Sequence, residues 1–193
     1  QEFIPMDYHL IREIPSEAYN SEVWKKELRT YCDLISEGPY YENTMFLIQD
    51  GWKALNGNRL IGYEFLQEGS PIYRFKNTSR DPEDYPSPEL SDGLIHSAGT
   101  LTDCIDFAYS MGWEEIIFVG VDLYDNRYFW LDYDEARDRH EDEGLDADNQ
   151  HKTAKPIVEL VGRWQEYFKK EGVKMYSLNP KSLLTEHLPV YEL

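Results

Sequence analysis

The sequence predicts an α/β fold in which a parallel sheet is flanked by helices. Three observations predict it: short apolar runs of strand length, longer segments with apolar residues at helical spacing, and the alternation of the two along the second half of the chain. Such alternation implies parallel strands joined by right-handed crossovers. With 193 residues, 41% of them apolar, we expect one domain spanning residues 1–193.

In the first half of the chain, residues Tyr8–Ile14 predict a strand that Pro15 ends. Ser21 is well placed to cap a following helix, whose apolar positions recur at helical spacing at Trp24, Leu28, Tyr31 and Ile35. Residues Thr44–Gln49 predict a buried strand, and Arg59–Phe65 a further one.

The stretch Lys76–Asp92 contains three prolines among polar residues and predicts an irregular loop. A helix is then expected with one apolar face, formed by Leu101, Cys104, Ile105, Ala108 and Met111. The apolar run Glu115–Val121 is typical of a central parallel strand. A last helix shows Ile157, Leu160, Val161, Trp164 and Phe168 on one face, and Val173–Leu178 predicts the final strand.

Charge and cysteine content limit the partners and the cellular compartment that we expect for this protein. There are 37 acidic against 19 basic residues, and a net charge of −18 argues against nucleic acid or an anionic membrane as partner. Nine of these carboxylates lie within residues 132–148, which we interpret as a solvated segment. Cys32 and Cys104 are expected as buried thiols. Without a membrane-spanning run or a signal sequence, we expect a cytoplasmic protein.

Three segments are expected at the carboxyl ends of the strands, where open parallel sheets bind ligands. In the first, His96 to Thr100, small residues precede a helix whose free amides suit an anion. The alternative is that Ser97 or Thr100 only caps the helix.

The second segment, Gly120 to Tyr124, is followed by Tyr128 and Trp130. Its Asp122 and the phenols suit a sugar or a phosphate, although aromatic residues in such loops also serve packing alone. The third segment places His151 directly before a helix, where it is either a general base or a surface residue.

We predict no metal site. Residues His140 to Glu143 form an acidic cluster, but their spacing matches neither paired zinc ligands nor a calcium-binding loop.

Three stretches of the second half, taken in order, carry a family resemblance: SAGTLTDCIDFAYSMGWEEIIFVGVDLYDNRYF, NQHKTAKPIVEL and VKMYSLNPKSLL. Between Ser97 and Leu184 the chain resembles the bacterial sialyltransferases that use CMP-activated sugars, and a related group of uncharacterised domains with a GxDLY strand end. The resemblance implies a Rossmann-like sheet and an enzyme of surface polysaccharide biosynthesis. Such an enzyme transfers an acidic sugar, of the sialic acid or Kdo type, from a CMP donor to a glycan acceptor, with inversion and without a metal.

Site residues follow from the same resemblance. It makes His151 the general base, and Tyr124 and Tyr128 the groups that stabilise the leaving phosphate, with Trp130 as the alternative to Tyr128. The residues expected to form the donor site are Ser97, Gly99, Thr100, Asp122, Asn179 and Ser182. We therefore expect the segments around Gly99, Tyr124 and His151 to share one rim of the sheet.

The family opens with a strand and a GxGPS-type turn that hold the nucleotide, and these residues show no counterpart. We therefore expect the first strands of the family sheet to be missing from this chain, leaving an exposed edge that favours a homo-oligomer. Two other functions stay open: a pterin pyrophosphokinase that uses ATP and magnesium, and a non-catalytic domain that binds a glycan or a protein.

Overall fold

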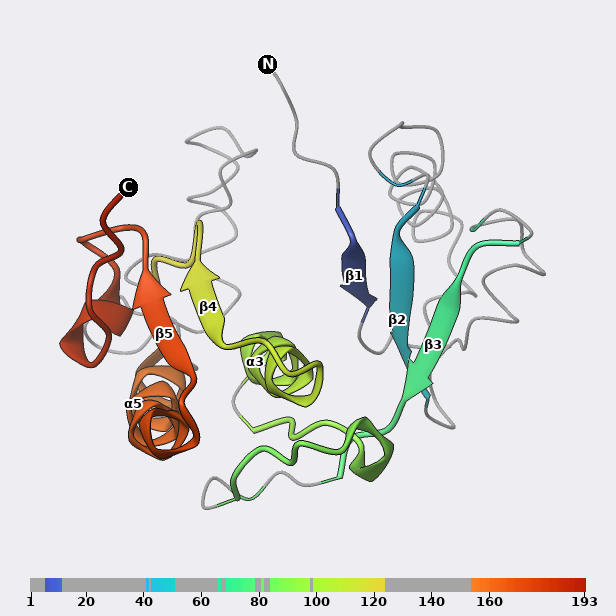
Figure 1. Cartoon of the computed structure of the whole chain (residues 1–193), viewed down its shortest axis with the longest axis horizontal. Helices are drawn as coiled ribbons and strands as arrows, with labels where there is room; N and C mark the ends of the chain where they lie inside the picture. The colour runs from blue at the N-terminus through green and yellow to red at the C-terminus, as the bar shows by residue number, and fades with distance from the viewer. Residues whose placement is uncertain are drawn as a thin grey trace, which may run out of the picture. The chain divides into compact units, whose positions relative to one another are not determined.

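The structure is a computed structural model and describes residues 6–11, 41, 43–50, 66, 69–78, 81, 84–97, 99–123 and 154–193. The chain divides into two compact units, Gln1–Asn77 and Thr78–Leu193. Each contains its own parallel sheet (Figure 1). The predicted parallel α/β class is therefore confirmed, whereas the expectation of one domain over residues 1–193 stays a prediction.

The first unit contains a three-stranded parallel sheet in the order β1-β2-β3. Its strands are β1 (Tyr8–Ile11), β2 (Met45–Gln49) and β3 (Ile72–Phe75). The central strand β2 is buried from Phe46 to Gln49, as expected for an apolar run with a neighbour on each side. The predictions for β1 and β2 are confirmed within the described residues.

Strand β3 was not predicted from the sequence. It has only four residues, and exposed Arg74 interrupts its apolar character, so no continuous apolar run marks it. The strand that the sequence predicted instead, Arg59–Phe65, lies outside the described residues.

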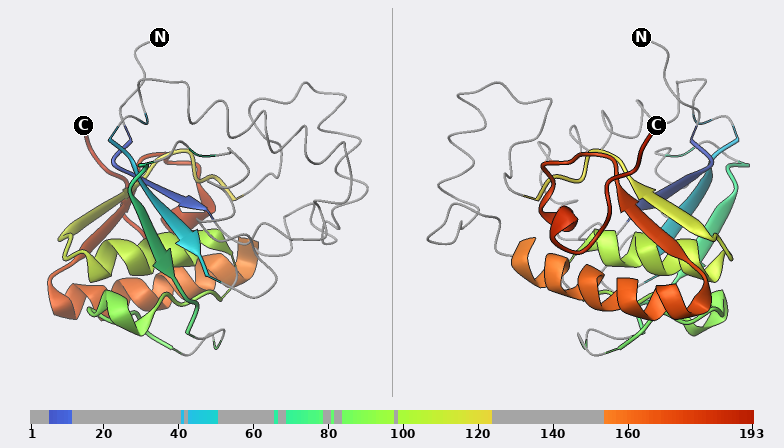
Figure 2. Two further views of the ribbon diagram at one scale, coloured as in Figure 1. Left: turned by 90° about the vertical axis from the view of Figure 1, so that its right-hand side faces the viewer. Right: turned by 60° about the vertical axis from the view of Figure 1, so that its left-hand side comes forward.

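The second unit is built around two parallel strands joined through a helix. Its elements are η3 (Leu90–Asp92), α3 (Thr100–Ser110), β4 (Glu115–Phe118), α5 (Ala154–Glu171), β5 (Lys174–Ser177) and η4 (Leu183–Glu186). Strand β4 pairs with β5 from Glu115 with Lys174 to Phe118 with Ser177. Helices α3 and α5 lie side by side on one face of this pair (Figure 2). Both predicted helices and both predicted strands are confirmed.

Glycines set the ends of several elements in this unit. Gly112 and Gly172, with φ of 75° and 83°, follow the ends of α3 and α5 in the left-handed conformation typical of helix ends. Gly120 has φ of 70°, and exposed Val119 precedes it. Because this conformation interrupts extended backbone, β4 ends at Phe118 rather than at the predicted Val121.

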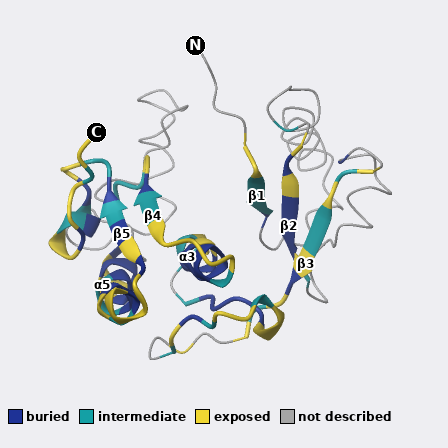
Figure 3. Cartoon of the chain, viewed as in Figure 1, coloured by how far each residue is buried: buried dark blue, intermediate teal, exposed yellow. Residues whose placement is uncertain are grey.

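The core of the second unit gathers around α5. Its largest fully buried side chains are Trp164 and Phe168. The indole Nε1 of Trp164 also donates to the Asp84 carbonyl at 3.0 Å, which ties the Lys76–Asp92 stretch to the helix. The described part of that stretch is irregular as predicted, apart from η3. In Figure 3 the exposed residues of α5 lie mainly on the side away from β5.

The buried face of α3 differs from the predicted one. Cys104 and Met111 were expected inward, but both are exposed. The helix instead buries three polar side chains, Thr102, Asp103 and Asp106, beside its apolar residues. The expectation of a buried thiol is therefore wrong at Cys104, and Cys32 lies outside the described residues.

Candidate functional site at the strand ends of the second unit

The segments that follow β4 and β5 meet at the carboxyl ends of these strands. The Asn179 side-chain amide donates to the Asp122 carboxylate, and the Leu183 amide donates to the Asp122 carbonyl at 3.0 Å. The hydroxyl of Ser182 donates to the Val121 carbonyl at 2.6 Å. Three of the residues predicted for the donor site, Asp122, Asn179 and Ser182, are thus brought together.

Intrachain hydrogen bonds occupy much of the polar capacity of this cluster. The Ser182 hydroxyl also accepts from the Leu184 amide at 3.2 Å as the cap of η4, and the residue is 1% exposed. The side-chain carbonyl of Asn179 accepts from the Lys181 amide at 2.9 Å. These two side chains therefore fix the shape of the turn after β5.

Backbone strain marks the same place. Leu123, directly after Asp122, has φ of 64°, the one positive φ among the non-glycine residues that the structure describes. A branched side chain in this conformation costs about 1 kcal/mol or more. Hydrogen bonds from the turn after β5 hold the backbone in this conformation: Asn179 donates to Asp122, and Ser182 donates to the Val121 carbonyl.

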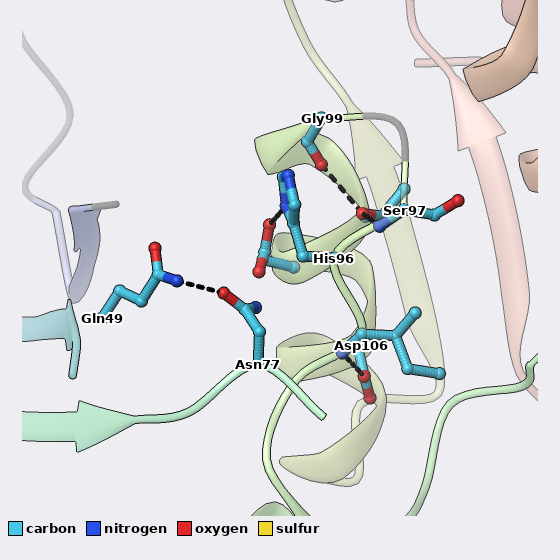
Figure 4. Close-up of polar contacts among 9 residues, drawn as sticks. Gln49, Asn77, His96, Ser97, Gly99 and Asp106 are labelled. Atoms are coloured by element: carbon cyan, nitrogen blue, oxygen red, sulfur yellow. Dashed lines mark hydrogen bonds and ion pairs between the residues drawn. The ribbon is translucent and has the colours of Figure 1, made fainter. Parts of the chain in front are cut away.

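The amino-terminal end of α3 holds a second group of the predicted site residues. The Thr102 hydroxyl accepts from the Ser97 amide at 3.2 Å and donates to the Gly99 carbonyl at 2.8 Å (Figure 4). Gly99 is the N-cap, and no side chain of the described residues caps the helix there. The capping alternative for Ser97 and Thr100 is therefore wrong.

Two predicted residues keep their hydroxyls available. Those of Ser97 and Thr100 make no hydrogen bond with a residue that the structure describes. The first amides of a helix have no intrahelical acceptor and attract anions. The start of α3 thus offers donors suited to a phosphate or a carboxylate.

Gly99 also brings α3 close to α5. A Cβ atom at this position would lie 3.2 Å from Cδ1 of Ile157, in the first turn of α5. Because this distance is tighter than ordinary van der Waals contact, an alanine at this position would require the end of the Ile157 side chain to shift. The small residue predicted for this position therefore has a packing role as well.

A histidine and a carboxylate form a buried pair just before and within α3. His96 Nδ1 lies 2.6 Å from Oδ2 of Asp103, and the two residues are 8% and 0% exposed. Sequence reasoning named His96 only as part of its segment and missed Asp103 altogether. The available signal was a pair of aspartates, Asp103 and Asp106, one turn apart between apolar residues of a helix.

Asp106 is the second buried carboxyl of α3. It accepts a hydrogen bond from the Ile95 amide at 2.7 Å and is 1% exposed. Burial, helped by the nearby charge of Asp103, raises the pKa of Asp106 to about 7, even though the hydrogen bond from the Ile95 amide lowers it. Close to neutral pH, Asp106 therefore exchanges a proton.

The remaining predicted residues, His151, Tyr124 and Tyr128, lie outside the described residues, as do Trp130 and the acidic cluster at residues 140–143. Within the described ranges, no group of three or more histidine, cysteine or acidic side chains has the geometry of a metal site. In the same ranges no helix is both long and apolar enough to cross a membrane.

Comparisons with protein-family models, with curated proteins and with solved structures gave no match to this chain.

Proposed function

We propose that the chain is a glycosyltransferase that moves an acidic sugar from a CMP donor to a glycan acceptor, with inversion and without a metal. The observation that carries the proposal is the contact between Asn179 and Asp122. It joins the two strand-end segments that the family resemblance assigns to the donor site. In a parallel sheet, such strand ends form the usual place for a ligand.

The described residues support distinct roles within this proposal. The amides at the start of α3 and the hydroxyls of Ser97 and Thr100 would bind the donor phosphate. The cluster of Asp122, Asn179 and Ser182 would hold the rim in shape beside it. Tyr124 and Tyr128 would donate to the leaving phosphate, a role that rests on the resemblance.

The proposed base lies outside the described residues. In sequence, His151 stands three residues before Ala154, where α5 begins. The close approach of Gly99 to Ile157 brings the first turn of α5 next to the start of α3. Under the proposal, His151 would accept the proton of the attacking hydroxyl while the bond to the CMP phosphate breaks, a role that rests on the resemblance.

Thermal unfolding with nucleotides tests the proposal. CMP and a CMP-sugar are each expected to raise the melting temperature without added metal, because a ligand that binds only the folded state stabilises it. His151→Ala is expected to abolish CMP release from CMP-sialic acid or CMP-Kdo while leaving the CMP-induced shift unchanged. His187→Gln is a matched control, because His187 is an exposed histidine of the same unit.

Other ligand responses would point elsewhere. A shift that requires ATP and magnesium together would favour the pyrophosphokinase. The mutual hydrogen bonds of Asp122, Asn179 and Ser182 give some support to the non-catalytic alternative, because these side chains are engaged without a ligand. Absence of any shift with CMP, CMP-sugar or ATP would favour that alternative and contradict the transferase.

A further inference from the structure

The contact between His96 and Asp103 favours one tautomer of a neutral imidazole. An ionised carboxylate only accepts hydrogen bonds, so the ring nitrogen that lies 2.6 Å from Asp103, Nδ1, must carry a proton. In the neutral imidazole the other nitrogen, Nε2, then has a free lone pair. The structure therefore orients a hydrogen-bond acceptor at His96.

The free edge of the ring faces the start of α3. The Nδ1 edge is the one that contacts Asp103, and Figure 4 shows the opposite edge of the ring turned toward Gly99. His96 makes no other hydrogen bond with the residues described, and its side chain keeps 10% of its surface exposed. A nine-tenths buried imidazole, whose Nε2 makes no hydrogen bond with a described residue, thus lies beside the start of α3.

The pair is not needed for packing. His96 follows two buried apolar residues, Leu94 and Ile95. An apolar residue at position 96 could be buried in the same way, and the protein would then not have to bury the carboxylate of Asp103 as its partner. Burying a carboxylate with a polar partner rarely makes a fold more stable than well-packed apolar residues of similar size would. A buried pair whose outer nitrogen stays unbonded is better explained by a ligand than by stability.

We propose that His96, positioned by Asp103, accepts a hydrogen bond from a neutral hydroxyl of the same ligand whose phosphate binds the amides of α3. The ligand class is then a phosphate ester carrying a free hydroxyl near the phosphate. This inference rests on the proposed function, and in a CMP-sugar the hydroxyl belongs either to the ribose or to the transferred sugar. The phosphate itself does not suit Nε2, because both would be acceptors.

Calorimetric titration of the full chain with three ligands tests the assignment: CMP, its 2′,3′-dideoxy analogue, and CMP-sialic acid. If the ribose supplies the hydroxyl, the native protein binds CMP about tenfold more tightly than the dideoxy analogue, the effect of one hydrogen bond. If the sugar supplies it, CMP-sialic acid is preferred over CMP by a similar factor. His96→Phe is expected to abolish whichever preference is found.

Two further variants separate recognition from structure. His96→Gln places an amide oxygen near the position of Nε2 and is expected to restore part of the preference. Asp103→Asn offers Nδ1 a donor, so that Nε2 gains the proton and the preference is lost. Nitrogen-15 NMR of the imidazole in Asp103→Asn reports this change of tautomer directly. This measurement does not depend on the His96→Phe variant, so it remains possible if that variant fails to fold.

Each outcome decides the question. Unchanged preferences in His96→Phe, or equal weakening of all three ligands, would overturn the role of His96 and leave the transferase proposal intact. No binding of any of the three ligands by the native protein would overturn the proposed function and this inference together. Loss of the preference in His96→Phe and Asp103→Asn, with His187→Gln unaffected, would support the inference.

Discussion

The two helices of the second unit differ in the polarity of the faces that they bury. Helix α5 buries mostly apolar side chains, with Trp164 and Phe168 at its centre. Helix α3 buries Thr102, Asp103 and Asp106 within its first two turns. Apolar burial stabilises a fold, whereas buried carboxyls reduce stability unless they are well paired. The difference indicates that α5 contributes more to stability than the start of α3 does.

The strongest test of this division is Trp164→Ala. Trp164 is fully buried, and removing its side chain leaves a large cavity and an unpaired Asp84 carbonyl. We expect a loss of about 3–5 kcal/mol in the free energy of unfolding. Urea unfolding followed by far-UV circular dichroism measures it. Trp164→Phe is the control, and its free energy of unfolding should fall clearly less, because most of the ring volume remains. A loss below about 1 kcal/mol for Trp164→Ala would contradict the view that α5 is central to the stability of this unit.

The contrast between the helices also shows what the sequence could predict. Helix α5 follows directly from Ile157, Trp164 and Phe168, because apolar residues at helical spacing report burial. For α3 the same rule found the helix but placed Cys104 and Met111 inward, where both are exposed. Aspartate is rarely buried, so apolar spacing does not report Asp103 or Asp106, and only their place between apolar residues of the helix could have signalled them.

Partners beyond the helix explain these buried carboxyls. Asp106 is bonded to the Ile95 amide and Asp103 to His96, both of which depend on how the chain before α3 folds back. The contact of Asp122 with Asn179 was likewise inaccessible as a distance, but the family resemblance grouped both residues in the donor site, and the convergence of parallel strand ends explains why they meet. The sequence thus predicted that these two residues share a site and missed the buried pair of His96 and Asp103.

A second prediction concerns the pH dependence that α3 introduces. Asp106 has a pKa of about 7 in the folded chain, against an ordinary value of 3.8, so folding disfavours its ionised form. Its contribution to stability is therefore present below about pH 4, declines as the pH rises to about 7, and stays reduced above. Asp106→Asn is expected to raise the free energy of unfolding at pH 8 by up to about 4 kcal/mol, at 1.4 kcal/mol per pKa unit, with no gain at pH 4.

Urea unfolding of both proteins at pH 4, 6 and 8 measures this difference, and comparison with the native chain cancels the effect of the other carboxylates. The side-chain carbonyl of the introduced asparagine can still accept from the Ile95 amide, so the backbone contact is retained. A gain that is equal at all three pH values would mean that the charge of Asp106 is not the cause. Such a result would contradict the view that the buried carboxyl of Asp106 lowers the stability of the chain at neutral pH.

The smallest expected effect concerns the one glycine inside α5. A Cβ atom at Gly162 would lie 2.5 Å from Cγ of His187, so alanine there must displace the imidazole. Alanine also favours a helix over glycine by about 1 kcal/mol. In the native background we expect these effects to oppose each other and Gly162→Ala to be neutral or destabilising. In a His187→Ala background the clash is gone, and the same substitution should stabilise the chain by about 1 kcal/mol. Thermal unfolding of the four proteins of this double-mutant cycle measures the change of sign, and a stabilisation of equal size in both backgrounds would show that His187 does not limit the packing of α5.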